Sequence, residues 1–167
     1  MAGILVTGNA LTVKYDSNGN QLWTAPYAGS AVAMDSGGNF IVTGFAAGFN
    51  TVKISPNGTN LWSTSYIEPN GPVVSQAVVV DCGGNSYVAG SDTYVCYSSG
   101  STLVCYDGLL LVKYDQNGNQ LWKNVARMAS MPAVQVAGLA LDSSASVYVA
   151  VNGYREPYST YAFLPPP

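Results

Sequence analysis

The chain of 167 residues contains no histidine. Histidine is the usual general base near neutral pH and the commonest metal ligand, so its absence excludes Ser-His and Cys-His catalytic arrangements. The three cysteines, Cys82, Cys96 and Cys105, match neither a C-x-x-C motif nor the spacing of a zinc site. We therefore expect a protein that is not an enzyme, with no catalytic residues, no metal and no cofactor.

Charged side chains are scarce. They make up 9% of the chain, with six Lys or Arg and nine Asp or Glu, against about a quarter in an average protein. A chain without a basic patch is a poor partner for nucleic acid or an anionic membrane. No apolar run approaches the length of a membrane span, and the first ten residues lack the features of a signal peptide. Surface polarity must come from Ser, Thr, Asn, Gln, Gly and Tyr, which favours an extracellular or cell-surface protein.

Two sequence units alternate along the chain. The first occurs as VKYDSNGNQLW, VKISPNGTNLW and VKYDQNGNQLW, at 13–23, 52–62 and 112–122. The second occurs as AVAMDSGGNFIVTG, AVVVDCGGNSYVAG and GLALDSSASVYVAV, at 31–44, 77–90 and 138–151, and ILVTG at 4–8 matches its tail. Each unit places β-branched and aromatic residues around a turn, mostly Asn-Gly or Gly-Gly, which predicts a β-hairpin because Gly and Asn readily adopt positive φ. Two hairpins make a four-stranded sheet, and a period of about 40 residues predicts propeller blades.

The alternation of A-V-x-x-D-x-x-G-N-x-x-V-T-G with V-K-Y-D-x-N-G-x-x-L-W resembles the bacterial and archaeal β-propeller repeat family often called SBBP. The likeness covers nearly the whole chain except residues 91–108 and the tail after Asn152. It implies a propeller in a secreted or surface protein, usually without a known catalytic role. The last repeat departs from the pattern, since Ser-Ala-Ser at 144–146 replaces Gly-Gly-Asn and Val151 replaces the closing Gly.

We therefore predict an all-β fold: a single domain over 1–167 formed by a β-propeller-like array of four-stranded antiparallel blades. The array has about three and a half blades, approximately at 1–27, 28–67, 74–126 and 134–167, with a hairpin insertion at 91–108. The first blade lacks an AVAMD-like strand and the last lacks its Leu-Trp strand, so the array is incomplete at both ends. Unpaired strand edges are templates for pairing with another chain.

The open edges favour a structural protein whose copies self-associate into a closed homo-oligomer or a filament. The chain could instead be a fragment of a larger propeller. A different class of function is a binding module, in which the 91–108 hairpin holds a glycan or a surface protein. Its Tyr94, Tyr97 and Tyr106 suit such an interface and equally suit packing against a neighbouring blade.

The D-x-N-G-N loops at 16–20 and 115–119 carry oxygen-bearing side chains at positions 1, 3 and 5, as the start of a calcium loop does. However, their Gly falls at position 4, no Glu closes the loop, and the copy at 55–59 has Ser in place of Asp. Asp-x-Asn-Gly is also a good hairpin turn, because the Asp side chain accepts hydrogen bonds from backbone N–H groups. The turn interpretation is favoured over a metal site.

Two other side chains recur at fixed positions. Lysines in the third strand of each blade could attract an anionic ligand, but shielding of a strand or pairing with a nearby Asp is favoured; they are Lys14, Lys53 and Lys113. Tryptophans that follow a Leu could stack on sugars, but packing between blades is favoured; they are Trp23, Trp62 and Trp122.

Cys96 and Cys105 occupy equivalent places in the 91–108 hairpin, which predicts a cross-strand disulfide if the protein is exported. The alternative is a pair of buried thiols. Cys82 has no obvious partner and is expected to be a free thiol. Asn57-Gly58-Thr59 matches the N-glycosylation acceptor motif, but it is also the turn of the repeat, so the sequence leaves glycosylation of Asn57 open.

Overall fold

The computed structural model of the chain describes residues 11–27, 29–45, 49–68, 73–99, 102–127 and 133–154. This part of the chain forms twelve strands in four antiparallel sheets, without a helix. The prediction of an all-β fold is therefore confirmed. No sheet closes on itself. Since these residues contain no helix, none of them forms an apolar helix of membrane-spanning length.

The strands follow chain order within each sheet. Sheet A consists of β1 (Thr12–Tyr15) and β2 (Gln21–Ala25). Sheet B consists of β3 (Ala31–Met34), β4 (Phe40–Phe45), β5 (Phe49–Ile54) and β6 (Asn60–Tyr66). Sheet C consists of β7 (Val73–Val80), β8 (Ser86–Ser99), β9 (Thr102–Tyr114) and β10 (Gln120–Arg127). Sheet D consists of β11 (Ala133–Leu141) and β12 (Val147–Tyr154).

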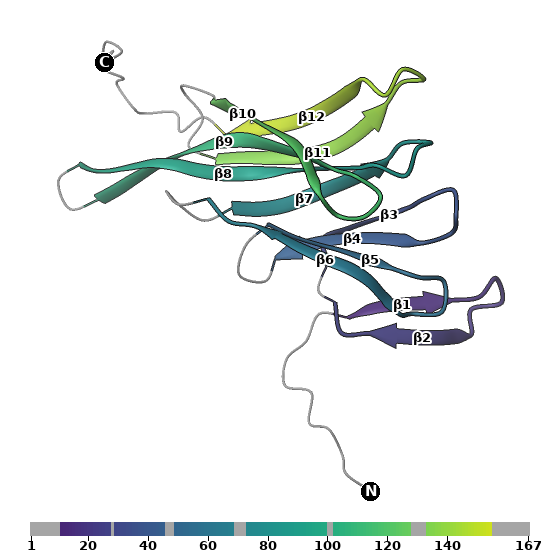
Figure 1. Cartoon of the computed structure of the whole chain (residues 1–167). Coiled ribbons are helices and arrows are strands. Elements are labelled where there is room, and N and C mark those ends of the chain that lie inside the picture. Colours follow the sequence, from purple (N-terminus) through teal and green to yellow (C-terminus); the bar gives the residue numbers. More distant parts are fainter. Residues whose placement is uncertain are drawn as a thin grey trace, which may run out of the picture.

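Each sheet is stacked on the next, in the order A, B, C, D (Figure 1). The first strand of sheet C, β7, packs against β3, β4 and β5 of sheet B. The first strand of sheet D, β11, packs in the same way against β7, β8 and β9 of sheet C. Sheet D is therefore placed on sheet C much as sheet C is placed on sheet B.

The main core lies between sheets B and C. Its largest fully buried side chains include Ile41 and Phe49 from sheet B and Leu110 and Tyr114 from sheet C. A smaller cluster of Ala25, Val42 and Ile54 joins sheet A to sheet B. The apolar residues that alternate along the repeated strands are thus used mainly for contact between sheets.

The predicted hairpin at 91–108 forms as the outer part of a longer hairpin. Strands β8 and β9 pair from Ser86 and Tyr114 out to Ser99 and Thr102. Strand β7 begins opposite Asp92 and β10 ends opposite Gly108, so beyond this level β8 and β9 pair only with each other among the described strands. The resulting two-stranded ribbon projects from the stack (Figure 1). The segment lengthens its strands because no Pro or Asn-Gly turn interrupts the β-branched and aromatic residues before the tip.

Candidate functional site

A Lys and a Trp lie directly opposite each other in the last hairpin of sheets A, B and C. The cross-strand pairs are Lys14–Trp23, Lys53–Trp62 and Lys113–Trp122. Each hairpin carries a register irregularity next to this pair, between the pair and the turn. The repeated sequence thereby places a Trp, a Lys and a tight turn together at one end of each sheet.

The turns use their acidic side chains to hold the backbone. One carboxylate oxygen of Asp16 accepts hydrogen bonds from the backbone N–H groups of Asn18 and Asn20, each at 2.8 Å. The other accepts the side-chain amide of Asn20 at 2.9 Å. This side-chain bond, together with the backbone bonds, lowers the pKa of Asp16, and the equivalent bonds lower the pKa of Asp115. In the described ranges no three His, Cys, Asp or Glu side chains gather around a possible metal position.

The first two tryptophans each bind the turn of the following sheet. The indole N–H of Trp23 donates to the carbonyl of Pro56 at 3.0 Å, and that of Trp62 donates to the carbonyl of Gln116 at 2.9 Å. The rings also cover the turn glycines: a Cβ atom added to Gly58 would lie 3.3 Å from Trp23, and one added to Gly118 would lie 2.8 Å from Trp62. These glycines have φ of +90° and +85°. A side chain at either position would therefore be strained and would also press on the ring.

Two of the three recurrent lysines form ion pairs with carboxylates. Lys53 forms an ion pair with Asp35 of its own sheet at 2.8 Å and also reaches the carbonyl of Gln116 at 3.4 Å. Burial by itself would raise the pKa of Asp35, but hydrogen bonds from Lys53 and Asn39 outweigh it and lower the pKa to about 2. Lys113 lies 3.9 Å from Asp81. Lys53 and Lys113 thus pair with carboxylates within their own sheets, whereas Lys14 donates to the carbonyl of Pro56 at 3.0 Å.

At each end of the stack, the described residues supply one of the two partners of the contact between a Trp and a turn of the next sheet. Trp122 is 38% exposed and meets Tyr87 of its own sheet, with ring centroids 6.0 Å apart. With Val147 and Ala145 of sheet D it lines a groove of about 490 Å³. At the opposite end, Gly19 occupies the place of Gly58 and Gly118, but no described atom lies within 4 Å of its Cβ position. Within the part of the chain that the structure describes, Trp122 therefore contacts no turn of a following sheet, and the turn at Gly19 is covered by no Trp.

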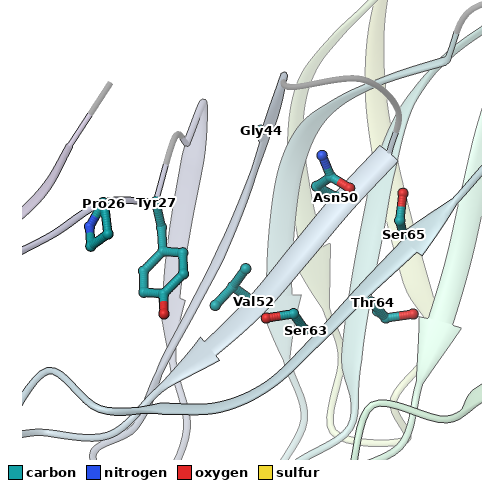
Figure 2. Close-up of a pocket in the computed structure, with 8 residues that line it drawn as sticks. All are labelled: Pro26, Tyr27, Gly44, Asn50, Val52, Ser63, Thr64 and Ser65. Carbon is teal, nitrogen blue, oxygen red and sulfur yellow. The ribbon is translucent and has the colours of Figure 1, made fainter. Parts of the chain in front are cut away.

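A second groove, of about 350 Å³, opens between residues 26–27, which follow β2, and sheet B (Figure 2). Its lining is neutral and comprises Pro26, Tyr27, Gly44, Asn50, Val52, Ser63, Thr64 and Ser65. The hydroxyl and amide groups could hydrogen-bond a neutral polar ligand. The described residues that line the groove include no carboxylate and no amine.

The side chains of Tyr94, Tyr97, Tyr106, Cys96 and Cys105 lie outside the described part of the structure. The backbone places Cys96 directly opposite Cys105 in the β8–β9 pair. Directly opposed residues have Cβ atoms about 4.5–5.5 Å apart, close to the separation within a disulfide, so the cross-strand disulfide stays a prediction with a compatible register.

Two turn residues singled out in the sequence are exposed. Cys82 is a free cysteine in the turn between β7 and β8. Asn57 lies in the turn between β5 and β6, where its side-chain oxygen accepts a hydrogen bond from the hydroxyl of Ser55. The side chain of Asn57 thus contributes to the turn that the repeat requires.

Sequence reasoning did not identify the acidic partners of the lysines. The signal was present, because Asp35, Asp81 and Asp142 recur at one position of the second unit. Pairing that position with the recurrent Lys requires knowing that the two hairpins of a sheet lie side by side. Sequence reasoning also missed that Ala145 keeps the positive φ of the glycines it replaces, at +59°.

No family model and no curated protein matches the chain. Among solved structures, a protein of unknown function from Bacteroides caccae is similar, with a TM-score of 0.41 and 12% sequence identity. The similarity covers 86% of this chain and 62% of that one, so this chain spans less than two thirds of its neighbour's length.

Proposed function

We propose that the protein is a β-propeller-type structural module whose stack of sheets continues into further copies of itself. It would serve as a building unit of a closed oligomer or a filament outside the cell, without catalysing a reaction. The observation that carries this proposal is the repeated Trp–turn contact. It joins sheet A to B and sheet B to C in the same way, and its two unused halves lie at opposite ends of one chain.

The stacking geometry supports the propeller assignment. Each complete sheet is a meander of four strands in chain order, as in a propeller blade. The first strand of each following sheet packs across three strands of the sheet before it, and this relation repeats from B–C to C–D. A relation that repeats without change generates either a ring or an open helical array.

Composition supports a place outside the cell. Charged residues are only 9% of the chain, so its exposed strands rely on neutral polar groups. The opposed cysteines of the projecting ribbon suit an oxidising compartment. Two observations support a structural role over catalysis. The groove between residues 26–27 and sheet B has a neutral lining, and repeated Asp and Lys side chains are engaged in turns and ion pairs.

The proposal is tested by measuring the mass of the protein in solution. Sedimentation velocity from about 1 µM to 1 mM, a range that spans weak to moderate affinities, should show species larger than one chain. Electron microscopy of the same samples then distinguishes a ring from a filament. A species that stays at the mass of one chain over the whole range would contradict the proposal.

A second candidate function is binding of a glycan or another surface protein by the ribbon at 93–107. The observation that favours it is the projection of β8 and β9 beyond β7 and β10 (Figure 1). Shortening the ribbon to a tight turn after Asp92 should remove binding on a glycan array while the stack and its self-association persist. Glycan binding that survives the deletion would reject this candidate.

A further inference from the structure

Sheet C, the last four-stranded sheet, provides a Trp for the Trp–turn contact without a turn bound to it among the described residues. Trp122 and Lys113 sit at the positions of Trp62 and Lys53. Yet within the described residues the indole N–H of Trp122 donates no hydrogen bond to a turn carbonyl, and its ring lines an open groove. No D-x-N-G or S-P-N-G turn follows Trp122 in the chain. A turn of this type that binds Trp122 would therefore come from outside residues 123–167.

The first sheet carries the complementary half. Its turn at 16–20 has the same hydrogen bonds as the turn at 115–119, including a Gly N–H to Asp carbonyl bond of 3.1 Å in both. Gly19 has φ of +84°, like Gly118 at +85°. Where Gly118 is covered by the Trp62 ring, Gly19 faces open space among the described residues. The turn at 16–20 is therefore preformed to receive a tryptophan.

The Asp and Lys residues that form ion pairs inside sheets B and C also recur singly, one at each end of the chain. Asp35 pairs with Lys53, and Asp81 pairs with Lys113. The third Asp of this series, Asp142, lies in sheet D, whereas the remaining Lys, Lys14, lies in sheet A. Neither forms an ion pair within the described ranges, although Lys14 donates to the carbonyl of Pro56. A negative group at one end of the chain thus matches a positive group at the other.

The strands are divided likewise. Among the described residues, sheets B and C contain both hairpins of the repeat, sheet D contains the first alone as β11–β12, and sheet A contains the second alone as β1–β2. Side by side, β11, β12, β1 and β2 have the order of one complete sheet. The groove next to Trp122 is bordered by Val147 of β12, so it lies where a second hairpin of sheet D would be placed.

We propose that sheet D of one copy and sheet A of a second copy form one composite four-stranded sheet. In this sheet β12 of the first copy pairs with β1 of the second. Trp122 of the first copy packs on Gly19 of the second and donates to the Ser17 carbonyl. Asp142 of the first copy pairs with Lys14 of the second. This inference rests on the proposed self-association and identifies the surfaces that perform it.

The arrangement is head to tail, because each copy has two different ends. We call the end with Trp122 and sheet D the donor end, and the end with Gly19 and sheet A the acceptor end. The twelve described strands of one copy correspond to three four-stranded sheets, so two copies joined at both ends would contain six. That number lies inside the range of about four to eight blades in which propellers close. If the rotation per sheet does not close, the same contact produces a filament.

The test uses three variants of the full chain. Trp122→Ala removes the donor end. Gly19→Asn fills the acceptor turn, and Asn tolerates a left-handed backbone better than other side chains. Gly84→Asn is the matched control, since Gly84 has φ of +80° and its Cβ position makes only an ordinary contact of 3.6 Å with Gln116. Circular dichroism verifies folding, and Gly19→Asn carries the test alone if Trp122→Ala does not fold.

Sedimentation velocity should show association of the wild type and of Gly84→Asn. Trp122→Ala and Gly19→Asn should each associate about thirtyfold more weakly, as expected for removal of a central aromatic anchor. An equimolar mixture of these two variants should form a heterodimer, because Gly19→Asn keeps the donor end and Trp122→Ala keeps the acceptor end. Such complementation is specific to a head-to-tail contact.

The outcomes separate this inference from the proposed function. If the wild type associates and Gly19→Asn associates equally well, the composite sheet is wrong while self-association stands. If the wild type remains one chain at all concentrations, both are wrong.

A further variant tests which strand lies beside β1. ILVTG at 4–8 is similar in sequence to FIVTG at 40–44, which belongs to β4, the second strand of sheet B. In the composite sheet, β12 of the other copy occupies this second-strand position beside β1. Replacing ILVTG by SSSTG should therefore leave association at least as tight as in the wild type. Loss of association in this variant would overturn the composite sheet.

Discussion

The packing of Trp62 on Gly118 allows a quantitative prediction. A Cβ atom at Gly118 would lie 2.8 Å from the Trp62 ring, closer than real Cβ atoms approach their neighbours, and φ there is +85°. Gly118→Ala therefore introduces two penalties, a left-handed alanine and a displaced indole. Gly84→Ala in the same sheet introduces only the first, since φ is +80° and the nearest atom lies at 3.6 Å.

The magnitudes follow from these two terms. A left-handed alanine costs about 1 kcal/mol, so Gly84→Ala should lower the free energy of unfolding by about that amount. Overpacking against a ring that can move only partly costs about 1–3 kcal/mol more. The displaced indole also loses its bond to the Gln116 carbonyl, worth about 1 kcal/mol. Gly118→Ala should therefore cost about 3–5 kcal/mol in total.

The assay is equilibrium unfolding in urea, followed by circular dichroism at a protein concentration that keeps the chains apart. A double-mutant cycle assigns the excess cost to Trp62. In a Trp62→Ala background, Gly118→Ala should cost no more than Gly84→Ala does, because the obstructing ring is gone.

Two results would refute this reasoning. If Gly118→Ala and Gly84→Ala destabilise equally, the Trp62 ring does not cover the turn. If the cycle shows additive costs, the excess at Gly118 arises from the backbone and not from the ring.

Four further predictions concern single features. Ala145→Gly should raise the free energy of unfolding by about 0.5–1 kcal/mol in urea titrations, because φ at Ala145 is +59°. Asp35 has a pKa of about 2 in the folded protein and about 3.9 when unfolded. Its contribution to the free energy of unfolding, about 2 kcal/mol, is therefore fully present above about pH 4 and is lost as the pH falls towards 2. Urea titrations at several pH values should show this loss in the wild type and a smaller loss in Asp35→Asn. Non-reducing peptide mass analysis of secreted protein should find Cys96 joined to Cys105. Millimolar calcium should leave the melting temperature unchanged, since the D-x-N-G-N carboxylates already bond their own turns.

The hairpins could be predicted because their signals are local. Asn-Gly and Gly-Gly between alternating apolar residues fix a turn and a strand period within about ten residues. The twelve described strands form six consecutive hairpins, β1–β2 to β11–β12, and each hairpin contains one copy of a repeated unit. Even the altered turn at 142–146 forms, because Asp142 still accepts the N–H groups of Ser144 and Ser146.

The difference between the tryptophans could not be predicted from the sequence. Trp23, Trp62 and Trp122 have nearly identical neighbours in the chain, yet among the described residues the first two bind a turn of the next sheet and Trp122 does not. What surrounds each ring depends on a segment more than thirty residues away in sequence, as the bond from Trp23 to Pro56 shows. Burial of a repeated side chain is thus a property of the stack and not of the repeat.

The chain-order pairing of the strands has a consequence for folding. Every paired strand follows its partner directly in the sequence, so each sheet closes only short loops, which favours fast formation. Near-identical hairpins also create a hazard, because VKYDSNGNQLW and VKYDQNGNQLW differ at one position and could exchange places in a refolding chain. During synthesis, however, sheet B can form before sheet C leaves the ribosome. We expect the order of translation to decide which copy of the hairpin occupies each place, so that refolding from denaturant yields more mispaired chains than synthesis does.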